Sequence, residues 1–403
     1  MLLVINSVNA QIVDSKAQVA VVEDSTEVAP GSGAKDQKDI RDVIRRLTRK
    51  EPPLELYKAE AKDFELSVVP AAGYTLQTGF TIILAANVVF YTDKQDLSHA
   101  STILTSVAYT QYNQVILPLS VNLWTRNKKY NIISDIRYMS YPSLTYGLGP
   151  STTLDDGYQI DFSYLKVHQT FLRRINKNLF AGVGYYLDHF WHEKEVNPVS
   201  TLTSFEEYGL FSNETASGIC LQAQWDNRAN QVNPTGGSYA SMRYRVSPKG
   251  MGSTDNWTMG VLELRKFMRF PGNTRNIIAL WNYNWMTFSG RPPYLLLPST
   301  GWDDFFNTGR GYIQGRYRAM NMSYLEGEYR FNLLRNGLLG AVVFTNLQTF
   351  SNTISTQYRK VVPGGGAGLR IKLNKNSSTN LAVDYGFGAE GSRGFFINLG
   401  EVF

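Results

Sequence analysis

The sequence predicts an all-β fold, namely a transmembrane antiparallel β-barrel of about 16 strands. The chain of 403 residues holds 24 tyrosines, 21 phenylalanines and 34 glycines but only 18% charged residues, a composition typical of strands and turns. No apolar run reaches the roughly 18–20 residues of a membrane helix, so a membrane span would have to consist of strands. From Phe64 onward, apolar and polar residues alternate with period two in segments of roughly 9–14 residues.

The first 63 residues lack this alternation. Residues 1–10 end in small residues and are interpreted as the remnant of a signal peptide, with a frayed terminus as the alternative. Residues 11–63 are predicted to hold a disordered tail and a short basic amphipathic helix from Asp36 to Lys50, ended by Pro52. This helix would lie on a membrane, plug a pore, dock a partner or serve as a linker. No POTRA domain fits in this segment.

Residues 64–403 are predicted to form the barrel. The expected strands are 65–72, 76–90, 97–111, 113–125, 128–140, 157–173, 178–190, 215–227, 237–247, 256–269, 274–288, 320–333, 336–347, 362–374, 379–388 and 393–402. A soluble β-sandwich or propeller is the alternative, but it favours shorter strands. In a bilayer the sheet must close, because unpaired edge groups cannot be hydrated there.

The two faces of the strands predict what each side of the barrel meets. The apolar faces, such as the one that carries Trp281, Tyr283 and Trp285, are expected to meet lipid. Charged residues would then point into the lumen: Asp135, Arg137, Arg243, Arg245, Glu263, Arg265, Glu326, Glu328, Arg330, Arg370, Lys372 and Asp384. Their mixed signs favour an ion-paired, plugged interior over a selective channel.

One long segment, Gly290 to Arg318, separates expected strands 11 and 12. It combines much aromatic mass with arginines on a glycine-permissive backbone, most clearly in Gly309-Arg310-Gly311-Tyr312. This composition favours a loop folded into a polar cavity, where Arg310 would bind carboxylates. An ordinary surface loop is the alternative.

Several function classes are disfavoured. The net charge of +6 is scattered, which argues against nucleic-acid binding, and the single cysteine, Cys220, forms no disulfide framework. His189 and His192 resemble metal ligands, but they are expected in a loop after strand seven without an evident third ligand. No serine stands at a motif position beside them. We therefore predict no catalytic residue, no metal and no cofactor, and no enzymatic activity.

Four features carry a family resemblance. They are the loop residues Arg310, Gly311 and Tyr312; the hairpin residues Asp226, Arg228, Pro234 and Gly236; the segment Leu325–Phe331; and Gly364–Arg370 with Asp384 and the terminal Phe403. Because these four features occur in the order found in that family, the chain resembles the barrel domain of the Omp85 superfamily (bacterial surface antigen family, BamA- and TamA-like), and specifically its short members without POTRA domains. Two positions depart from the family pattern. Gly309 replaces a valine, and Asn346 stands where a carboxylate is usual.

The resemblance implies an outer-membrane barrel that acts in protein insertion, translocation or membrane biogenesis. Arg310 would be held in the lumen by Glu328, Glu326 and Asn346. A weak seam would join the first and last strands, with residues Leu66, Val68, Phe395, Ile397, Leu399 and Phe403. Glycines in these strands weaken pairing, although barrel curvature is another use for them.

The partners implied by the resemblance are outer-membrane lipids (lipopolysaccharide and phospholipid), unfolded outer-membrane protein clients, and periplasmic or lipoprotein partners. The alternative function is a passive diffusion channel or a structural barrel that lost the assembly role.

Overall fold

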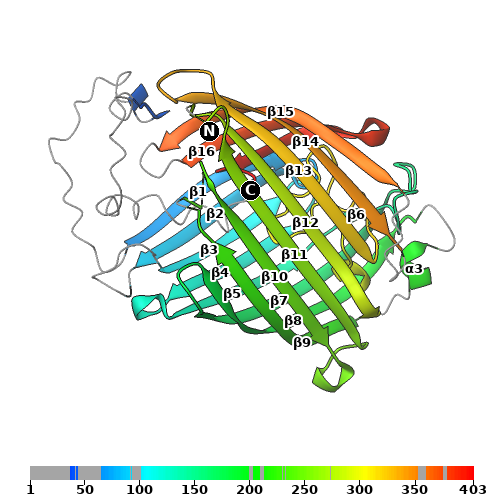
Figure 1. The fold of residues 1–403 in the computed structure, drawn as a ribbon. Helices are drawn as coiled ribbons and strands as arrows, with labels where there is room; N and C mark the ends of the chain where they lie inside the picture. The colour runs from blue at the N-terminus through cyan, green and yellow to red at the C-terminus, as the bar shows by residue number, and fades with distance from the viewer. Residues whose placement is uncertain are drawn as a thin grey trace.

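The computed structural model describes residues 37–40, 42–43, 65–90, 92, 101–198, 203–208, 213–228, 230–231, 233–272, 274–352, 360–374 and 379–403. These residues form one antiparallel sheet that rolls into a barrel with strongly tilted strands (Figure 1). The strands are β1 Glu65–Thr75, β2 Gly79–Phe90, β3 Ser101–Thr110, β4 Val115–Trp124, β5 Tyr130–Ser140, β6 Ser143–Thr145, β7 Tyr158–Arg174, β8 Leu179–Val196, β9 Asn213–Asp226, β10 Gly237–Ser247, β11 Trp257–Arg269, β12 Ile277–Gly290, β13 Asn321–Asn332, β14 Leu339–Ser351, β15 Val361–Asn374, β16 Thr379–Gly388 and β17 Arg393–Leu399. The short helix α3 Ser204–Tyr208 lies in the connection between β8 and β9, and its Phe205 packs on Tyr294.

The sheet follows the chain, since each strand pairs with the next in sequence. The short β6 is the exception, because it pairs with β7 beyond the end of β5 and so extends the same row. The wall therefore has 16 rows, and the predicted 16-stranded antiparallel barrel is confirmed. Among the described residues, no helix is both long and apolar enough to cross a bilayer.

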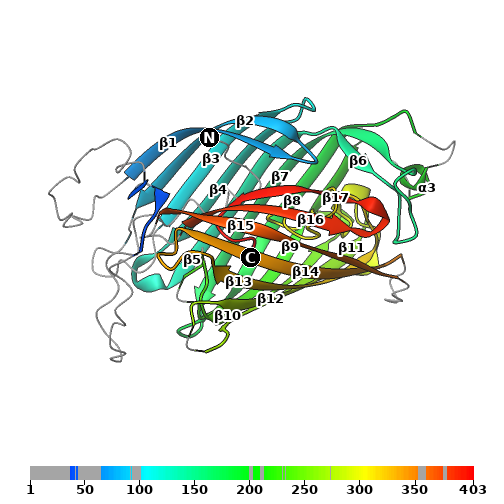
Figure 2. The same ribbon diagram turned by 90° about the horizontal axis from the view of Figure 1, so that it is seen from above.

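The two ends of the barrel differ, as Figure 2 shows from a second direction. At one end, the turn end, short turns join the strands, such as residues 125–129 and 175–178. At the other end, the loop end, lie the longer connections, including 141–157 and residues 291–320, here called the inward loop. The inward loop joins β12 to β13.

The outer face of the wall is apolar, as a lipid-facing surface requires. Ile82 is 73% exposed while its neighbour Ile83 is 2% exposed, and Leu221 is 54% exposed beside the buried Cys220. This contrast follows from the strand geometry, because successive side chains point to opposite faces. The exposed belt continues over most of the rows.

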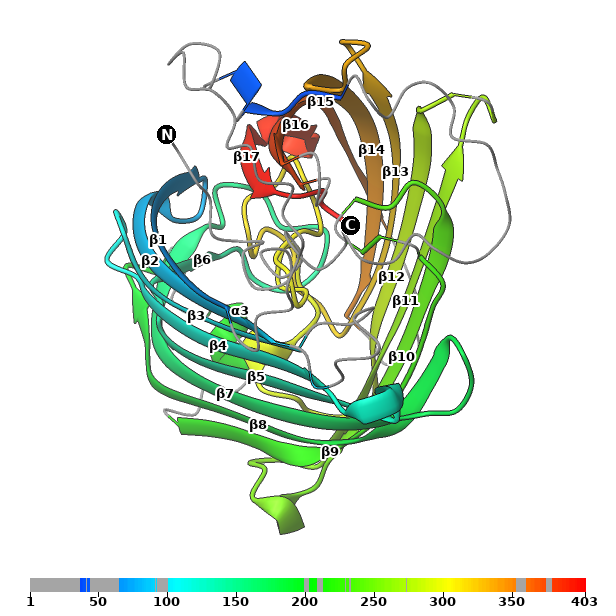
Figure 3. The same ribbon diagram turned by 90° about the vertical axis from the view of Figure 1, so that its left-hand side faces the viewer.

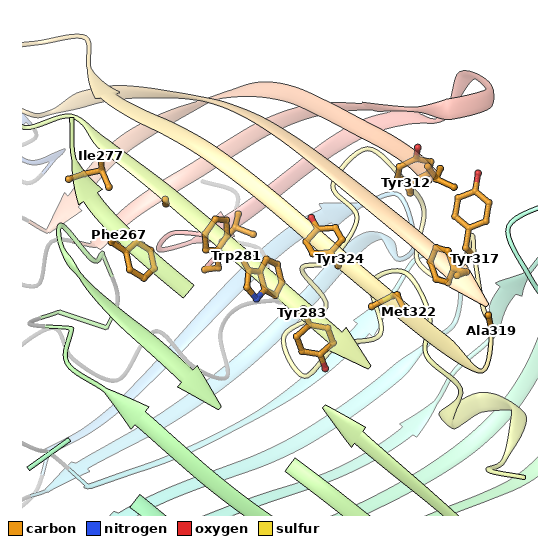
Figure 4. Close-up of a cluster of buried hydrophobic side chains, with 14 residues drawn as sticks. Phe267, Ile277, Trp281, Tyr283, Tyr312, Tyr317, Ala319, Met322 and Tyr324 are labelled. Atoms are coloured by element: carbon orange, nitrogen blue, oxygen red, sulfur yellow. The ribbon is translucent and has the colours of Figure 1, made fainter. Parts of the chain in front are cut away.

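The inner face carries the main apolar cluster of the molecule (Figure 4). Phe267 of β11, Trp281 and Tyr283 of β12 pack there with Tyr312 and Tyr317 of the inward loop. The aromatic face of β12 therefore points into the lumen, and the prediction that it meets lipid was wrong. The reason is that Phe403 gives Trp281 an apolar partner inside the barrel, with the two rings stacked 5.2 Å apart.

On the outer side of β12, Asn282 and Asn284 are satisfied locally. Asn284 Nδ2 donates to Asn282 Oδ1 at 2.6 Å, and Asn282 Nδ2 donates to the carbonyl of Tyr324 at 3.0 Å. The same strand thus carries polar residues outward and aromatic residues inward, the reverse of the expected pattern.

The first and last strands are neighbours, but no ladder joins β1 to β17 among their described residues. They touch at the loop end, where a Cβ on Gly394 would lie 2.2 Å from Leu76 Cδ1. β17 has 7 residues against 11 in β1, so it cannot cover the whole edge of β1. The view along the barrel in Figure 3 places both edges on the same side.

Three further expectations have a structural outcome. The last strand ends at Leu399 rather than at residue 402. His189 and His192 lie within β8, not in a loop, because β8 extends to Val196. The expected signal peptide remnant and most of the tail and helix lie outside the described residues, although Lys38 N donates to the carbonyl of Asn336 at the turn end, at 3.1 Å.

Candidate functional site at the inward loop

The inward loop is a narrow hairpin-like segment whose two limbs enter the lumen side by side from the loop end. Its two limbs are joined by hydrogen bonds from Thr300 N to the Tyr317 carbonyl and from Ala319 N to the Pro298 carbonyl, both 3.0 Å. At the tip, Gly311 has a φ of +108°, which favours glycine. A Cβ there would also lie 2.6 Å from the Phe387 carbonyl oxygen, so glycine lets the tip approach β16.

Arg310 is the centre of the site and is 1% exposed. Its Nη1 donates to Asp384 Oδ2 of β16 at 2.7 Å, and its Nη2 donates to Glu326 and Glu328 of β13. The guanidinium also lies 3.7 Å from the centre of the Phe344 ring of β14. Three carboxylates and one aromatic face thus surround a single cation, an arrangement we call the Arg310 clasp.

Asn346 takes part in a different way from the one expected. Its Nδ2 donates to the backbone carbonyl of Arg310 at 2.9 Å and does not meet the guanidinium. An amide suits this role because it can donate to a carbonyl, whereas a carboxylate at this position cannot. The third carboxylate of the clasp is Asp384, which sequence reasoning had placed in the lumen without assigning it to Arg310.

Two arginines connect the clasp to the end of the chain. Arg370 of β15 donates to Asp384 Oδ1 at 2.5 Å and to Glu401 Oε2 at 2.7 Å. Arg330 of β13 donates to Glu328 Oε2 at 2.6 Å and to the Phe403 carbonyl at 3.1 Å. The clasp and the last residues of the chain therefore form one charged network.

The C-terminal segment, Gly400–Phe403, turns into the lumen after β17. Gly400 has a φ of +95°, and beyond it the Phe403 ring stacks on Trp281 at 5.2 Å. Asn307 Nδ2 of the inward loop donates to the Val402 carbonyl at 2.7 Å. Phe403 was expected in the seam, and this expectation was wrong. The turn at Gly400 and the ion pair of Glu401 with Arg370 draw the segment inward.

Tyr312 fixes the tip of the loop to the neighbouring strands. Its hydroxyl donates to the Pro363 carbonyl and accepts from Ala389 N at 2.7 Å. Burial raises the pKa of the Tyr312 phenol, so the hydroxyl stays protonated and able to donate. A Cβ on Gly388 would lie 2.5 Å from Cζ of this ring, which shows how closely the tip is packed.

The hairpin residues lie at the turn end between β9 and β10, apart from the clasp. Asp226 Oδ2 pairs with Arg228 Nη2 at 2.8 Å, and the Arg228 guanidinium lies 4.7 Å from the Tyr239 ring centre. Pro234 is buried. Gly236 has open space where a Cβ would stand.

The conformational need for glycine in this hairpin falls instead on Gly237. It has a φ of +94°, and a Cβ on it would lie 3.0 Å from Arg228 Cα. Of the two consecutive glycines in this hairpin, Gly237 is thus the one whose backbone conformation favours glycine.

The seam residues lie on the two edge strands. Leu66 and Val68 of β1 are 57% and 55% exposed, and Phe395 of β17 is 51% exposed, so all three face outward. Ile397 is half-buried, and the side chain of Leu399 lies outside the described part of the chain. The side chains of Leu66, Val68 and Phe395 belong to the lipid-facing belt on either side of the missing ladder.

Comparison with known proteins agrees with this architecture. No family model and no curated protein matches the sequence. Among solved structures, BamA from Haemophilus ducreyi lacking POTRA domains 1–3 matches with a TM-score of 0.56 and 14% identity, over 89% of this chain and 76% of that chain. CdiB from Acinetobacter baumannii matches with a TM-score of 0.53 and 14% identity, over 84% of this chain and 60% of that chain.

These likenesses concern the fold. A nearly closed wall of 16 antiparallel rows with an apolar outer belt is the architecture of multi-pass outer-membrane barrels. The chain has the barrel fold found in the BamA and CdiB structures, and the predicted resemblance to the Omp85 superfamily is confirmed at the level of the fold.

Proposed function

We propose that this chain acts in the bacterial outer membrane as an Omp85-type barrel that inserts or translocates other proteins and so serves outer-membrane biogenesis. The fold found in BamA and CdiB supports an activity of this class. The observation that carries the proposal is the single charged network from Arg310 of the inward loop to Glu401, two residues beyond β17. Through it, the position of the loop affects the end of the last strand.

The seam supplies the chemistry for insertion. Edge strands expose N–H and C=O groups, which are costly to leave unpaired in lipid and can pair with an incoming strand. β17 is shorter than β1, so part of the β1 edge toward the turn end faces no strand. An unfolded outer-membrane protein would pair with this edge, while lipopolysaccharide and phospholipid contact the outer belt. Periplasmic or lipoprotein partners would meet the turn end.

The clasp would keep the barrel in shape while the seam works. Arg310 ties the loop to β13 and β16, and Glu401 of the C-terminal segment pairs with Arg370 of β15, which in turn pairs with Asp384. A seam opening would therefore leave most of the wall in place. The alternative function, a passive channel, is less well supported because the inward loop and the C-terminal segment occupy the described lumen, where they line cavities of about 120 and 330 Å³.

The proposal is tested with the purified chain in liposomes. A urea-unfolded small outer-membrane protein is added, and its folding is followed by heat-modifiable gel mobility. The client should fold faster than in empty liposomes, and the exposed-site control Glu206→Gln should match the wild-type chain. Unchanged client folding, together with large steady conductance in planar bilayers, would instead establish the passive channel.

A further inference from the structure

A second charged contact fixes the inward loop on the side of the lumen opposite the clasp. The contact is made by an elbow of the loop, Asp303–Phe306. Asp304 Oδ2 pairs with Arg243 Nη2 of β10 at 2.6 Å, and Asp304 Oδ1 lies 3.9 Å from Lys166 Nζ of β7. Arg137 Nη2 of β5 donates to the backbone carbonyl of Asp304 at 3.1 Å. Three strands that take no part in the clasp thus hold the elbow.

The wall that receives Asp304 carries an excess of positive charge. Asp135 is already engaged, because it accepts two bonds from Arg137 at 2.7 and 2.9 Å and pairs with Lys166 at 2.7 Å. Asp135 thus pairs with two of the three cations, and the third, Arg243, pairs with the carboxylate of Asp304 from the loop. Although burial opposes its ionisation, Arg243 and Lys166 lower the pKa of Asp304 to about 2, so it is charged at neutral pH.

The elbow is held rigid from within the loop. Asp303 Oδ1 accepts from Thr308 N and from Thr308 Oγ1, both at 2.7 Å, and from Asn307 N at 3.0 Å. An aspartate that bonds the backbone of its own turn fixes the turn's shape. The next residue, Asp304, is thereby held toward the wall, and Phe306 lies 5.3 Å from the Arg137 guanidinium.

The elbow also stands between the two cavities of the lumen. The cavity of about 120 Å³ is lined by Leu295 and Trp302, near the base of the inward loop. The cavity of about 330 Å³ reaches Trp124 and Asp226, whose strands end at the turn end. Both cavities are lined by Asp304 and its three partners, Arg137, Lys166 and Arg243.

We propose that the contact of Asp304 with Arg243, Lys166 and Arg137 is a latch that seals the lumen, and that its release joins the two cavities into an ion-conducting path while the Arg310 clasp keeps the barrel folded. The proposal deepens the proposed function and rests on it, since it assigns the elbow and the tip of the inward loop different tasks. The clasp supports the wall and the seam. The latch closes the pore against leakage.

Planar-bilayer conductance of the purified full chain tests the latch. Asp304→Asn should raise the open probability by at least about tenfold, because one hydrogen bond between charged groups biases an equilibrium by such a factor. Arg243→Gln should do the same, and the double variant should exceed neither single variant by much, since both remove one contact. Asp255→Asn is the matched control. Asp255 pairs with Lys249 at the loop end and should leave conductance unchanged.

The outcomes separate the latch from the proposed function. Asp304→Asn should keep the heat-modifiable mobility of the folded barrel, and its effect on conductance is read without any client protein. Conductance equal to that of the wild-type chain, or equal opening in Asp255→Asn, would overturn the latch. Failure of Asp304→Asn to fold would overturn it as well, because the clasp alone is required to hold the barrel.

Discussion

Replacing Arg310 by alanine gives the most informative perturbation of the clasp. The three carboxylates that surround the guanidinium are fully buried, with side-chain exposures of 0%. Removing one partner of a buried ion pair costs about 3–5 kcal/mol, because the remaining charge is left uncompensated. We expect Arg310→Ala to lower the free energy of unfolding by this amount.

The structure indicates where that cost falls. Without Arg310, Glu328 still pairs with Arg330, and Asp384 still pairs with Arg370. Glu326 keeps only the hydroxyl of Tyr324. Glu326→Gln in the Arg310→Ala background should therefore recover about 1–3 kcal/mol, since it removes the charge that is left buried without a cation.

The assay is denaturant unfolding of the barrel in detergent, followed by tryptophan fluorescence and heat-modifiable mobility. Arg174→Ala, at an exposed arginine near the turn end, serves as the control and should change little. Equal stability of Arg310→Ala and the wild-type chain would refute the reasoning. So would a double variant that is no more stable than Arg310→Ala, because the cost would then lie elsewhere.

Two more predictions concern Gly311, at the tip of the inward loop, and Glu390, which lies between β16 and β17 and pairs with Arg316 of that loop. Gly311→Ala should destabilise the barrel by more than about 1 kcal/mol, owing to its positive φ and its contact with Phe387, whereas Gly236→Ala should be tolerated; thermal unfolding compares them. Partial burial opposes the ionisation of Glu390, but the hydrogen bonds from Arg316 and Lys360 lower its pKa below the ordinary 4.5. The stability that ionised Glu390 gives to the folded barrel is thus fully present above pH 4.5 and is lost as the pH falls through the lowered pKa of Glu390. The melting temperatures of the wild-type chain and of Glu390→Gln should therefore differ at neutral pH and converge in acid. A difference that persists in acid would contradict this.

Much of the wall could be predicted from the sequence because its determinants are local. The alternation around Leu221 and Cys220 reflects a side-chain period of two and survives any choice of neighbours. The position of the inward loop is also local, since it interrupts this period between two long strands. These features locate Arg310 without a structure.

The partners of Arg310 cannot be predicted from the residues next to it in the sequence. Asp384 is 74 residues away along the chain, and it meets Arg310 only after the wall has curved and the loop has entered the lumen. The aromatic face of Trp281 and Tyr283 was assigned to lipid because periodicity cannot distinguish a bilayer from apolar side chains packed inside the lumen, such as Phe403. Phe403 was placed in the seam for a related reason, since the turn at Gly400 depends on charged groups from β15 and β13.

Hydrogen exchange at the seam tests the central claim most directly. Amide exchange of segments 65–75 and 393–403 is measured by mass spectrometry on the barrel in lipid nanodiscs, for the wild-type chain, Arg310→Ala and Asp304→Asn. Loss of the clasp should speed exchange in both segments, because the network that holds the end of β17 then lacks its centre. Asp304→Asn should leave both near wild type. Exchange in 393–403 that is unchanged by Arg310→Ala would contradict the link between the inward loop and the seam.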